Sequence, residues 1–336
     1  MPTTTGLTVA VTGPTGTFGF GLLPLLQADP RIDRVVGIAR RQFDPAEHGW
    51  MKMTYRQGDV RDPDGLREAF RDADVVVHLA FQVTGAADRE TTRAVNVEGT
   101  LNAFRCAAAM GAQRFVYASS VAAYGFHPDN PVGMTEDWPV RPAARLFYAQ
   151  EKAELELSLQ AEAAEHPDVG LYLLRPPVVL GPHTTGGKEV VPGSASLGRL
   201  LLDGVRRWPL PVVVPVATFP VQFVHEDDVG QALLLCTVAA GPPGAYNITG
   251  DGVVTLADVV RELGLVPLPV PAAVAASAAR LASAVPLPPL VPPAAEWVEA
   301  LSHPSIMDAS KAKRELGWSP RYTSLGALRA PLARGD

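Results

Sequence analysis

Residues 7–19 read LTVAVTGPTGTFG, and this stretch decides the fold class. Its first six residues are apolar and mostly β-branched, as in a buried parallel strand. Apolar residues then recur at helical spacing as far as Gln27. The glycines therefore lie between a strand and a helix, where a dinucleotide-binding turn must be. There we expect Gly13 to make the tight bend, Gly16 to let the backbone approach a pyrophosphate, and Gly19 to let the helix pack closely.

The first half of the chain alternates between strand and helix patterns. Strands are predicted at 7–12, 34–39, 54–57, 75–79, 114–118 and 171–174, and helices at 17–28, 63–71, 90–111 and 147–165. Such alternation indicates an α/β fold, a Rossmann-type doubly wound parallel sheet. Beyond Arg175 proline becomes dense, which favours a smaller C-terminal substrate-binding lobe. We expect residues 1–178 and about 212–245 to form the nucleotide-binding domain, and about 179–211 and 246–330 the lobe.

Composition argues against several classes of function. The chain has 336 residues and a formal net charge of -6, and it lacks a run of basic residues, so nucleic acid is not an expected partner. Cys106 and Cys236 lie in apolar helical patterns without metal-ligand spacing. We therefore expect buried free thiols, no metal site and a reducing, cytoplasmic location.

No segment of the chain resembles a membrane anchor. The apolar stretch near the N-terminus follows no basic region and is soon broken by Gly13 and Pro14, unlike a signal peptide. The alanine-rich segment 270–291 contains Arg280 and several prolines, which disfavours a membrane span. We interpret it as a surface or pocket-covering helix.

A second group of residues carries chemistry: Ser119-Ser120 after a predicted strand, and Tyr148-x-x-x-Lys152 on a predicted helix. A phenol with a pKa of about 10 is a poor base at neutral pH. Lys152 shares a helix face with Tyr148, and its cation would favour the phenolate. Tyr148 would then exchange a proton with a substrate oxygen that a serine hydroxyl holds. The alternative for Tyr148 and Lys152 is a solvated helix pair.

The chain as a whole resembles the extended short-chain dehydrogenase/reductase family, the NAD-dependent epimerase/dehydratase group. The resemblance rests on an ordered set of motifs: the glycine turn, Gly58-Asp59-Val60, His78-Leu79-Ala80, Asn96-Val97-x-Gly99-Thr100, Ser119-Ser120, Tyr148-x-x-x-Lys152, Arg175-Pro176, Val224-His225-x-x-Asp228 and Gly317-Trp318-x-Pro320. It implies catalytic roles for Ser120, Tyr148 and Lys152, with Ser119 as the alternative to Ser120.

The same resemblance implies places for the cofactor. Asn96 would lie near the nicotinamide ribose, Ala80 would face it through its backbone, and Asp59 would meet the adenine; purely structural roles are the alternative for all three. The expected cofactor-binding residues are Gly13, Thr15, Gly16, Thr17, Phe18, Gly19, Arg40, Arg41, Asp59, Val60, Leu79, Ala80, Asn96, Ala118, Tyr148, Lys152, Pro176 and Val178.

The end of the second strand bears on the choice of cofactor. An acidic residue there accepts the ribose hydroxyls of NAD, whereas an arginine pairs with the 2′-phosphate of NADP. Here Ala39 occupies the acidic position, and Arg40 and Arg41 follow. Guanidinium groups suit phosphate, so we expect NADP, with NAD as the alternative.

The substrate is expected to be an apolar small molecule. Family members that act on nucleotide-diphosphate sugars typically carry two clamping arginines, but this chain has Val221 at the first position and no arginine in residues 302–308. Residues 176–182 and the lobe are rich in proline, alanine and valine, which favours an apolar pocket. The cations that remain available for an anion are His183, Lys188, Arg199, Arg206 and Arg207.

Three classes of function remain open. The first is an oxidoreductase with net turnover of NAD(P)(H), and the second is an epimerase or dehydratase, possibly on a sugar, that reoxidises its own cofactor. The third is a non-catalytic nucleotide sensor, against which the intact Ser120, Tyr148 and Lys152 argue. By the same resemblance, we expect a homodimer formed through the helices that carry Asn96 and Tyr148.

Overall fold

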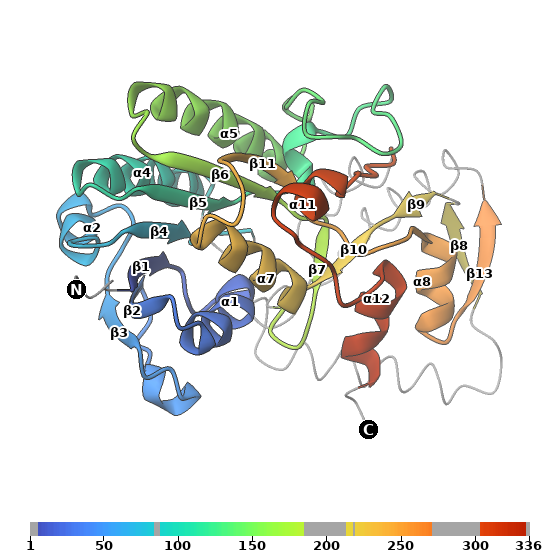
Figure 1. Ribbon diagram of the computed structural model, residues 1–336. Helices are drawn as coiled ribbons and strands as arrows, with labels where there is room; N and C mark the ends of the chain where they lie inside the picture. Colours follow the sequence, from blue (N-terminus) through green and yellow to red (C-terminus); the bar gives the residue numbers. More distant parts are fainter. Residues whose placement is uncertain (1–5, 84–87, 185–212, 218, 271–302, 334–336) are drawn as a thin grey trace.

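Seven parallel strands form the central sheet of the computed structural model, which describes residues 6–83, 88–184, 213–217, 219–270 and 303–333 (Figure 1). The strand order is β11-β6-β5-β4-β1-β2-β3, and every pairing in this sheet is parallel. The strands are β1 (Leu7–Thr12), β2 (Ile32–Ala39), β3 (Met53–Gln57), β4 (Val75–His78), β5 (Arg114–Ala118), β6 (Gly170–Arg175) and β11 (Gly244–Asn247). This order confirms the predicted doubly wound α/β fold.

Helices cover both faces of the sheet (Figure 1). Helices α1 (Thr17–Ala28) and α7 (Glu226–Thr237) pack on one face, where Val9 and Val11 of β1 point. Helices α2 (Pro63–Ala69), α4 (Gly99–Ala109) and α5 (Phe147–Glu165) pack on the other face, where Ala10 points. The alternation of side chains along β1 thus supplies both cores, which explains why its sequence is apolar without interruption.

The helix expected at 90–111 is divided. It consists of α3 (Arg89–Arg93), a π-helical segment η2 (Ala94–Glu98) and α4. The Asp88 side chain accepts a hydrogen bond from Thr91 N and begins the first piece. The π-helical turn carries Asn96, and the side-chain amide of Asn96 forms hydrogen bonds with residues outside this turn. The two short 3₁₀ helices are η1 (Pro45–His48) and η3 (Val121–Tyr124).

Outside the central sheet, the described residues form three two-stranded sheets. They pair β7 (Val178–Leu180) with β10 (Phe223–His225), β9 (Pro220–Val221) with β12 (Val254–Thr255), and β8 (Val213–Ala217) with β13 (Val266–Val270). Helices α8 (Leu256–Glu262), α11 (Ser310–Glu315) and α12 (Ser324–Ala333) complete the described part. The division into domains stays a prediction, but one piece of it differs: β8, β9 and β10, expected in the nucleotide-binding domain, pair outside the central sheet. Strand β11, in contrast, extends that sheet to Asn247.

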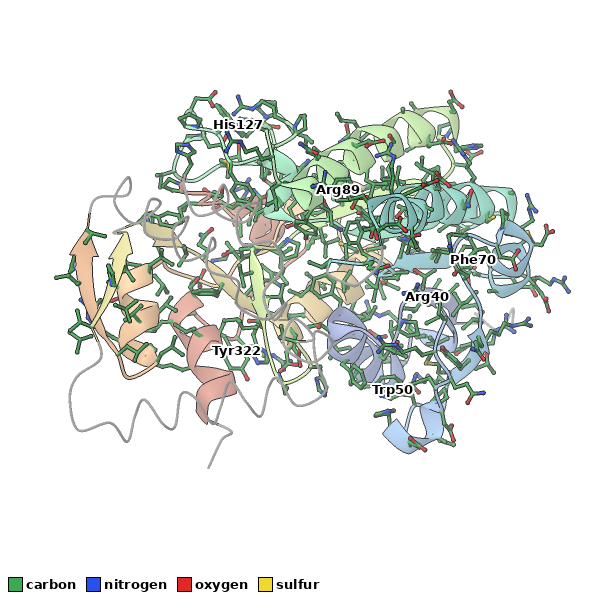
Figure 2. The ribbon with its side chains drawn as sticks, turned by 180° about the vertical axis from the view of Figure 1, so that it is seen from behind. Arg40, Trp50, Phe70, Arg89, His127 and Tyr322 are labelled. Atoms are coloured by element: carbon green, nitrogen blue, oxygen red, sulfur yellow. The ribbon has the colours of Figure 1, made fainter. Side chains whose placement is uncertain are left out.

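Two of the distant motifs contact each other. The buried Asp228 carboxylate accepts hydrogen bonds from the backbone N–H groups of Arg321 and Tyr322, and its carbonyl accepts one from Trp318 Nε1. Tyr322, labelled in Figure 2, stacks on the ring of His225 at a centroid distance of 4.1 Å. The His-x-x-Asp motif therefore anchors the C-terminal segment onto α7.

The remaining sequence predictions are partly tested by the described residues. Cys106 and Cys236 are buried free thiols, as expected. No helix in the described ranges is both long and apolar enough to cross a membrane. The segment 271–291, with Arg280, and the cations Lys188, Arg199, Arg206 and Arg207 lie outside the described residues.

Candidate active site

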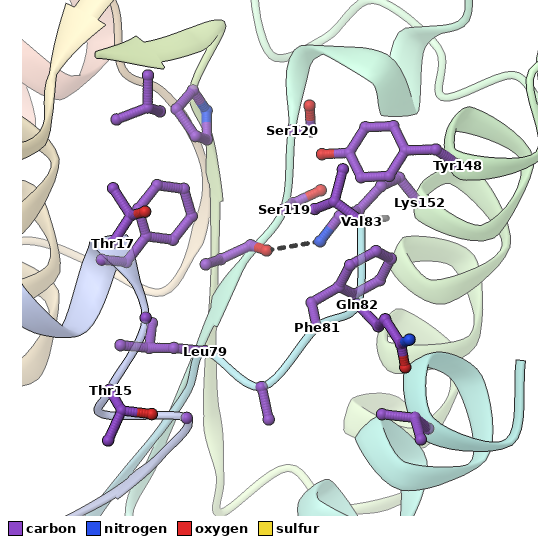
Figure 3. A pocket seen from close by; sticks show the side chains of 18 of the residues that line it. Thr15, Thr17, Leu79, Phe81, Gln82, Val83, Ser119, Ser120, Tyr148 and Lys152 are labelled. Carbon is purple, nitrogen blue, oxygen red and sulfur yellow. Dashed lines mark hydrogen bonds between the residues drawn. The ribbon is translucent and has the colours of Figure 1, made fainter. Parts of the chain in front are cut away.

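A single cavity of about 680 Å³ holds most of the residues expected at the site (Figure 3). It lies at the carboxyl ends of β1, β2, β4, β5 and β6, the edge at which doubly wound folds bind nucleotides. Every residue named above for cofactor binding or catalysis lines it, except Gly19 and Asn96. The cavity runs from Arg40 and Asp59 at one end to Ser120 and Tyr148 at the other.

The glycine turn forms one wall of the cavity. Gly13 adopts a φ of +66°, and a Cβ atom there would lie 2.7 Å from Ala80 N, so any other residue would push β1 and the loop after β4 apart. At Gly19 a Cβ would lie 1.9 Å from Pro14 O, so this glycine lets α1 pack against the turn itself. Gly16 is the N-cap of α1 and gives the helix no side-chain cap. The start of α1 thus fits a pyrophosphate, whose charge suits a helix N-terminus.

The arginine end of the cavity is held by β3. Gln57 Nε2 donates to Arg40 O at 2.9 Å, and the Tyr55 hydroxyl contacts the carbonyls of Ala39 and Arg41. Asp59, expected near the adenine, pairs with Arg61 at 2.7 Å, and that hydrogen bond lowers the pKa of its carboxyl group. Arg40 adds to this effect from a distance. The Arg40 side chain is visible in Figure 2.

The two serines have different partners. Ser120 caps the 3₁₀ helix η3 and forms a side-chain hydrogen bond with Tyr148. Ser119 instead bonds to the Glu156 carboxylate in the interior. Burial raises the pKa of Tyr148 to about 12, and the bond with Ser120 only partly offsets this. Of the two serines, Ser120 is therefore the one that shares a hydrogen bond with the tyrosine hydroxyl. Figure 3 shows the Ser120 side chain beside this hydroxyl.

The Lys152 ammonium has its hydrogen-bond partners on β5, and its expected effect on the Tyr148 phenolate stays a prediction. Its Nζ donates to the Tyr117 hydroxyl at 3.0 Å and to Ala118 O at 2.9 Å, and lies 5.9 Å from the centroid of the Tyr148 ring. Burial lowers the pKa of Lys152 to about 7, against the opposing effect of Glu156 and Glu151. The sequence places Lys152 on the correct helix face, but β5 supplies the partners of its ammonium.

A chain of buried hydrogen bonds holds the loop after β4. Thr100 Oγ1 donates to Asn96 O, so His78 Nε2 must be the donor to Thr100 at 3.0 Å. His78 Nδ1 then accepts from Thr12 Oγ1 at 2.9 Å. Thr12 Oγ1 in turn accepts from the backbone of Leu79 and Ala80. Burial lowers the pKa of His78 to about 3, so the ring is neutral, as this pattern requires.

Asn96 does not line the cavity, and its expected place near the nicotinamide ribose stays a prediction. Its Oδ1 accepts from Gln82 N at 2.7 Å, and its Nδ2 donates to Gln82 O at 3.0 Å and to Glu151 Oε2 at 2.8 Å. The amide is fully buried, because the π-helical turn directs it toward the loop after β4. Asn96 thus fixes Gln82, which does line the cavity.

The wall near Ser120 and Tyr148 is mainly apolar. It includes Val121, Ala122, Phe126, Pro177, Val178 and Val179. Val221, at the position of the first missing arginine, packs in an apolar cluster with Leu180 and Tyr322. His183 is not a free cation for a ligand, because its Nδ1 pairs with the buried Glu226 at 2.7 Å and its ring stacks on Phe20.

Sequence reasoning missed several lining residues. They are Ile38, Phe81, Gln82, Val83, Val95, Val121, Ala122, Phe126 and Thr184. Many directly extend a motif that was recognised, and the rule that loops after parallel strands form the site would have included residues 81–83. Within the described residues, no group of three or more histidine, cysteine or acidic side chains is arranged to hold a metal.

Residues 9–249 match the model of the NAD dependent epimerase/dehydratase family. The chain belongs to this family. It is thus an enzyme of the extended short-chain dehydrogenase/reductase type, as the motifs implied. The uncharacterized protein y4nG of Sinorhizobium fredii is 30% identical over 327 residues, which is 94% of this chain and 76% of the relative.

Two further relatives have named activities. A 2-alkyl-3-oxoalkanoate reductase of Shewanella oneidensis is 28% identical over 236 residues, 68% of this chain and 59% of the relative. A UDP-glucose 4-epimerase of Vibrio cholerae is 26% identical over 327 residues, 94% of this chain and 91% of the relative.

Solved structures share the fold along the whole chain. A UDP-glucose 4-epimerase of Thermotoga maritima with UDP-glucose superposes with a TM-score of 0.71 at 19% identity, covering 97% of this chain and 98% of the other. The Thermus thermophilus UDP-glucose 4-epimerase complex with NAD gives 0.68 at 22% identity, covering 98% and 100%.

Proposed function

We propose that this enzyme is an NAD(P)-dependent oxidoreductase that reduces a carbonyl group, or oxidises an alcohol, on a hydrophobic small molecule. The observation that carries the proposal is the hydrogen bond between Ser120 and Tyr148, at the apolar end of a cavity that the glycine turn also lines. One cavity therefore has room for a dinucleotide and for a substrate beside it.

The side chains suit proton transfer at the substrate oxygen. The Ser120 hydroxyl would hold and polarise that oxygen, and the Tyr148 hydroxyl would donate its proton to it in the reductive direction. After this transfer, the positive charge of the Lys152 ammonium would stabilise the Tyr148 phenolate. Lys152 Nζ lies 5.9 Å from the centroid of the Tyr148 ring. A bound nicotinamide supplies the hydride that the carbonyl carbon accepts.

The cofactor is held, in this proposal, along the cavity wall. The start of α1 at Gly16 and Thr17 would bind the pyrophosphate, Asp59 and Val60 would lie at the adenine, and Leu79, Ala80, Ala118, Pro176 and Val178 would lie beside the nicotinamide half. Arg40 and Arg41 favour NADP, because both residues follow the end of β2, line the cavity and carry guanidinium groups that suit a 2′-phosphate. NAD is the alternative that the NAD complex of the Thermus enzyme supports.

The apolar wall and the missing arginines support a substrate without a diphosphate. Val221 is a partly buried member of the apolar cluster that includes Leu180 and Tyr322, so its place offers no charge to a phosphate. The reductase of Shewanella oneidensis acts on an alkyl oxoalkanoate by its name, and it agrees with a hydrophobic carbonyl substrate. We further propose a cytoplasmic enzyme, paired as a homodimer through α4 and α5.

A self-recycling epimerase or dehydratase is the second candidate. The observation that favours it is the similarity to the Vibrio cholerae epimerase along 94% of this chain. Such an enzyme would retain tightly bound NAD and would show no net change in it.

Calorimetric titration of the purified protein with NAD⁺, NADP⁺, NADH and NADPH tests these proposals. Absorbance at the reduced-nicotinamide band is first recorded on the protein as purified. Exchangeable binding with a preference for NADP(H) is the expected result. Retained NAD that does not exchange would favour the second candidate, and failure to bind any of the four would refute the interpretation of the glycine turn.

A further inference from the structure

Three aromatic rings surround the ammonium group of Lys152. Its Nζ lies 3.6 Å from the ring centroid of Phe81, 4.7 Å from that of Tyr117 and 5.9 Å from that of Tyr148. A cation within about 6 Å of a ring is attracted by the negative electrostatic potential of the ring face. The rings come from three different elements: the loop after β4, strand β5 and helix α5. Lys152 and Phe81 are labelled in Figure 3.

The donors of this ammonium are distributed among these partners. An ammonium has three N–H groups, and two hydrogen bonds of Lys152 go to the Tyr117 hydroxyl and to Ala118 O. The Phe81 ring is so close that it takes the place of a third acceptor. Lys152 is 3% exposed, so these contacts replace most of the water that a lysine normally keeps around its charge.

Phe81 is itself fixed from two sides. Its ring meets the Tyr148 ring edge-on, with centroids 5.7 Å apart and an interplanar angle of 88°. The neighbouring Gln82 is clamped through its backbone N–H and carbonyl by the Asn96 amide. The ring therefore has a set position between the lysine and the tyrosine.

We propose that Phe81 and Tyr117 are positioning residues that form an aromatic cage around the Lys152 ammonium and hold it, as a cation, beside Tyr148. The cage is a property of this chain whether or not the proposed reaction is correct, whereas its value to catalysis rests on the proposed function. Both residues act through Lys152, and neither is assigned a contact with the reacting atoms.

A cage of rings differs from a carboxylate partner in its effect on chemistry. A carboxylate in direct contact would neutralise the lysine and draw its charge away from Tyr148. Ring faces stabilise the ammonium and leave its full charge to act on neighbouring groups. The titratable groups that face Lys152 are Tyr148, Glu151 and Glu156 of α5, Tyr117 of β5 and His78 of β4.

The experiment measures the titration of Lys152 directly, without cofactor or substrate. Lysine labelled with ¹³C at Cε is incorporated, and the Lys152 signal is assigned by its loss in Lys152→Met; the other lysines are Lys52, Lys188, Lys311 and Lys313. In the parent protein we expect a midpoint near the pKa of about 7 that burial imposes.

Phe81→Leu and Tyr117→Phe each remove one partner of the ammonium, Phe81→Tyr tests rescue by a ring, and Tyr172→Phe is the control. Phe81→Leu keeps apolar bulk but removes the ring, and Tyr117→Phe keeps the ring but removes the hydroxyl acceptor. Each should lower the Lys152 midpoint by about 0.5 to 1.5 pH units, because each removes a stabilising partner of the cation. Phe81→Tyr, which restores a ring face, should return it. Tyr172→Phe removes a partly buried hydroxyl, whose partner is Gly241 O, from β6 and should leave the midpoint unchanged.

The outcomes separate the two proposals. An unchanged or raised midpoint in Phe81→Leu would overturn the cage, since the Phe81 ring would then only exclude water or only fill space. A fall in Tyr117→Phe alone would assign the stabilisation to the hydroxyl and would likewise overturn the cage. Thermal unfolding of each variant verifies that it is folded. If the midpoints fall as expected but calorimetry finds no binding of any nicotinamide dinucleotide, the cage stands and the proposed function fails.

Discussion

Glu156 and Arg175 form a buried ion pair directly beneath the candidate active site. Both Nε and Nη2 of Arg175 donate to the Glu156 carboxylate, and both side chains are at most 2% exposed. Glu156 also accepts from Ser119, and Arg175 Nη1 donates to the Tyr124 hydroxyl. The pair thus ties α5 and β6 to the segment that carries Ser120.

Glu156→Gln should destabilise the protein by about 3 to 5 kcal/mol, because it leaves the Arg175 cation buried without its counter-charge. The matched control is Glu154→Gln on the same helix, whose pair with Arg93 is 41% and 46% exposed. That change should cost less than about 1 kcal/mol. Denaturant unfolding measures both, and equal losses would contradict the importance of burial.

Tyr148→Phe should lower turnover by about a hundredfold or more, because the proton donor to the substrate oxygen is lost. Its affinity for the cofactor should stay nearly unchanged, since the ring remains. Steady-state rates and calorimetry with the preferred dinucleotide measure the two effects. The control Tyr172→Phe should keep both the turnover and the cofactor affinity of the parent. A variant as fast as the parent would remove Tyr148 from the chemistry.

The double change Arg40→Ser with Arg41→Ser should weaken NADP binding by about tenfold to a hundredfold and alter NAD binding little, because only NADP carries the 2′-phosphate. Arg34→Ser removes one positive charge from β2, outside the cavity, and should change neither affinity. Calorimetric dissociation constants give the comparison. Parallel losses for NADP and NAD would show that the arginines do not read the 2′-phosphate.

His78 should make the protein sensitive to acid. Its pKa is lowered from 6.5 to about 3 in the folded state by burial, so between these values the unfolded chain binds one more proton than the folded one. Stability is therefore complete above pH 6.5 and falls as the pH drops toward 3, by about 1.4 kcal/mol per pH unit from this residue.

The variant His78→Gln isolates this effect, because it replaces the ring with a polar group that does not titrate. The difference in unfolding free energy between parent and variant should shrink as the pH is lowered from 6.5 to 4. Urea unfolding at several pH values measures it. A difference that is constant over this range would show that His78 does not carry the acid sensitivity.

The sequence by itself determined the features that depend on neighbours along the chain. The strand, glycine turn and helix at residues 7–28, the alternation of strands and helices, and the shared helix face of Tyr148 and Lys152 follow from periodicity and from the backbone freedom of glycine. Residues 114–118, for instance, are β5 as predicted. These patterns are short-range, so they can be recognised without knowing the order of the strands.

Only the tertiary structure decided which distant side chains meet. The order β11-β6-β5-β4-β1-β2-β3 brings Phe81 after β4 and Tyr117 on β5 to the ammonium of Lys152, and it turns Asn96 toward Gln82 instead of the cavity. It also brings Ser119 into a hydrogen bond with Glu156 and Ser120 into a hydrogen bond with Tyr148. Local periodicity contains no information about strand order, and the partners of a buried charge depend on that order because they come from neighbouring strands and loops.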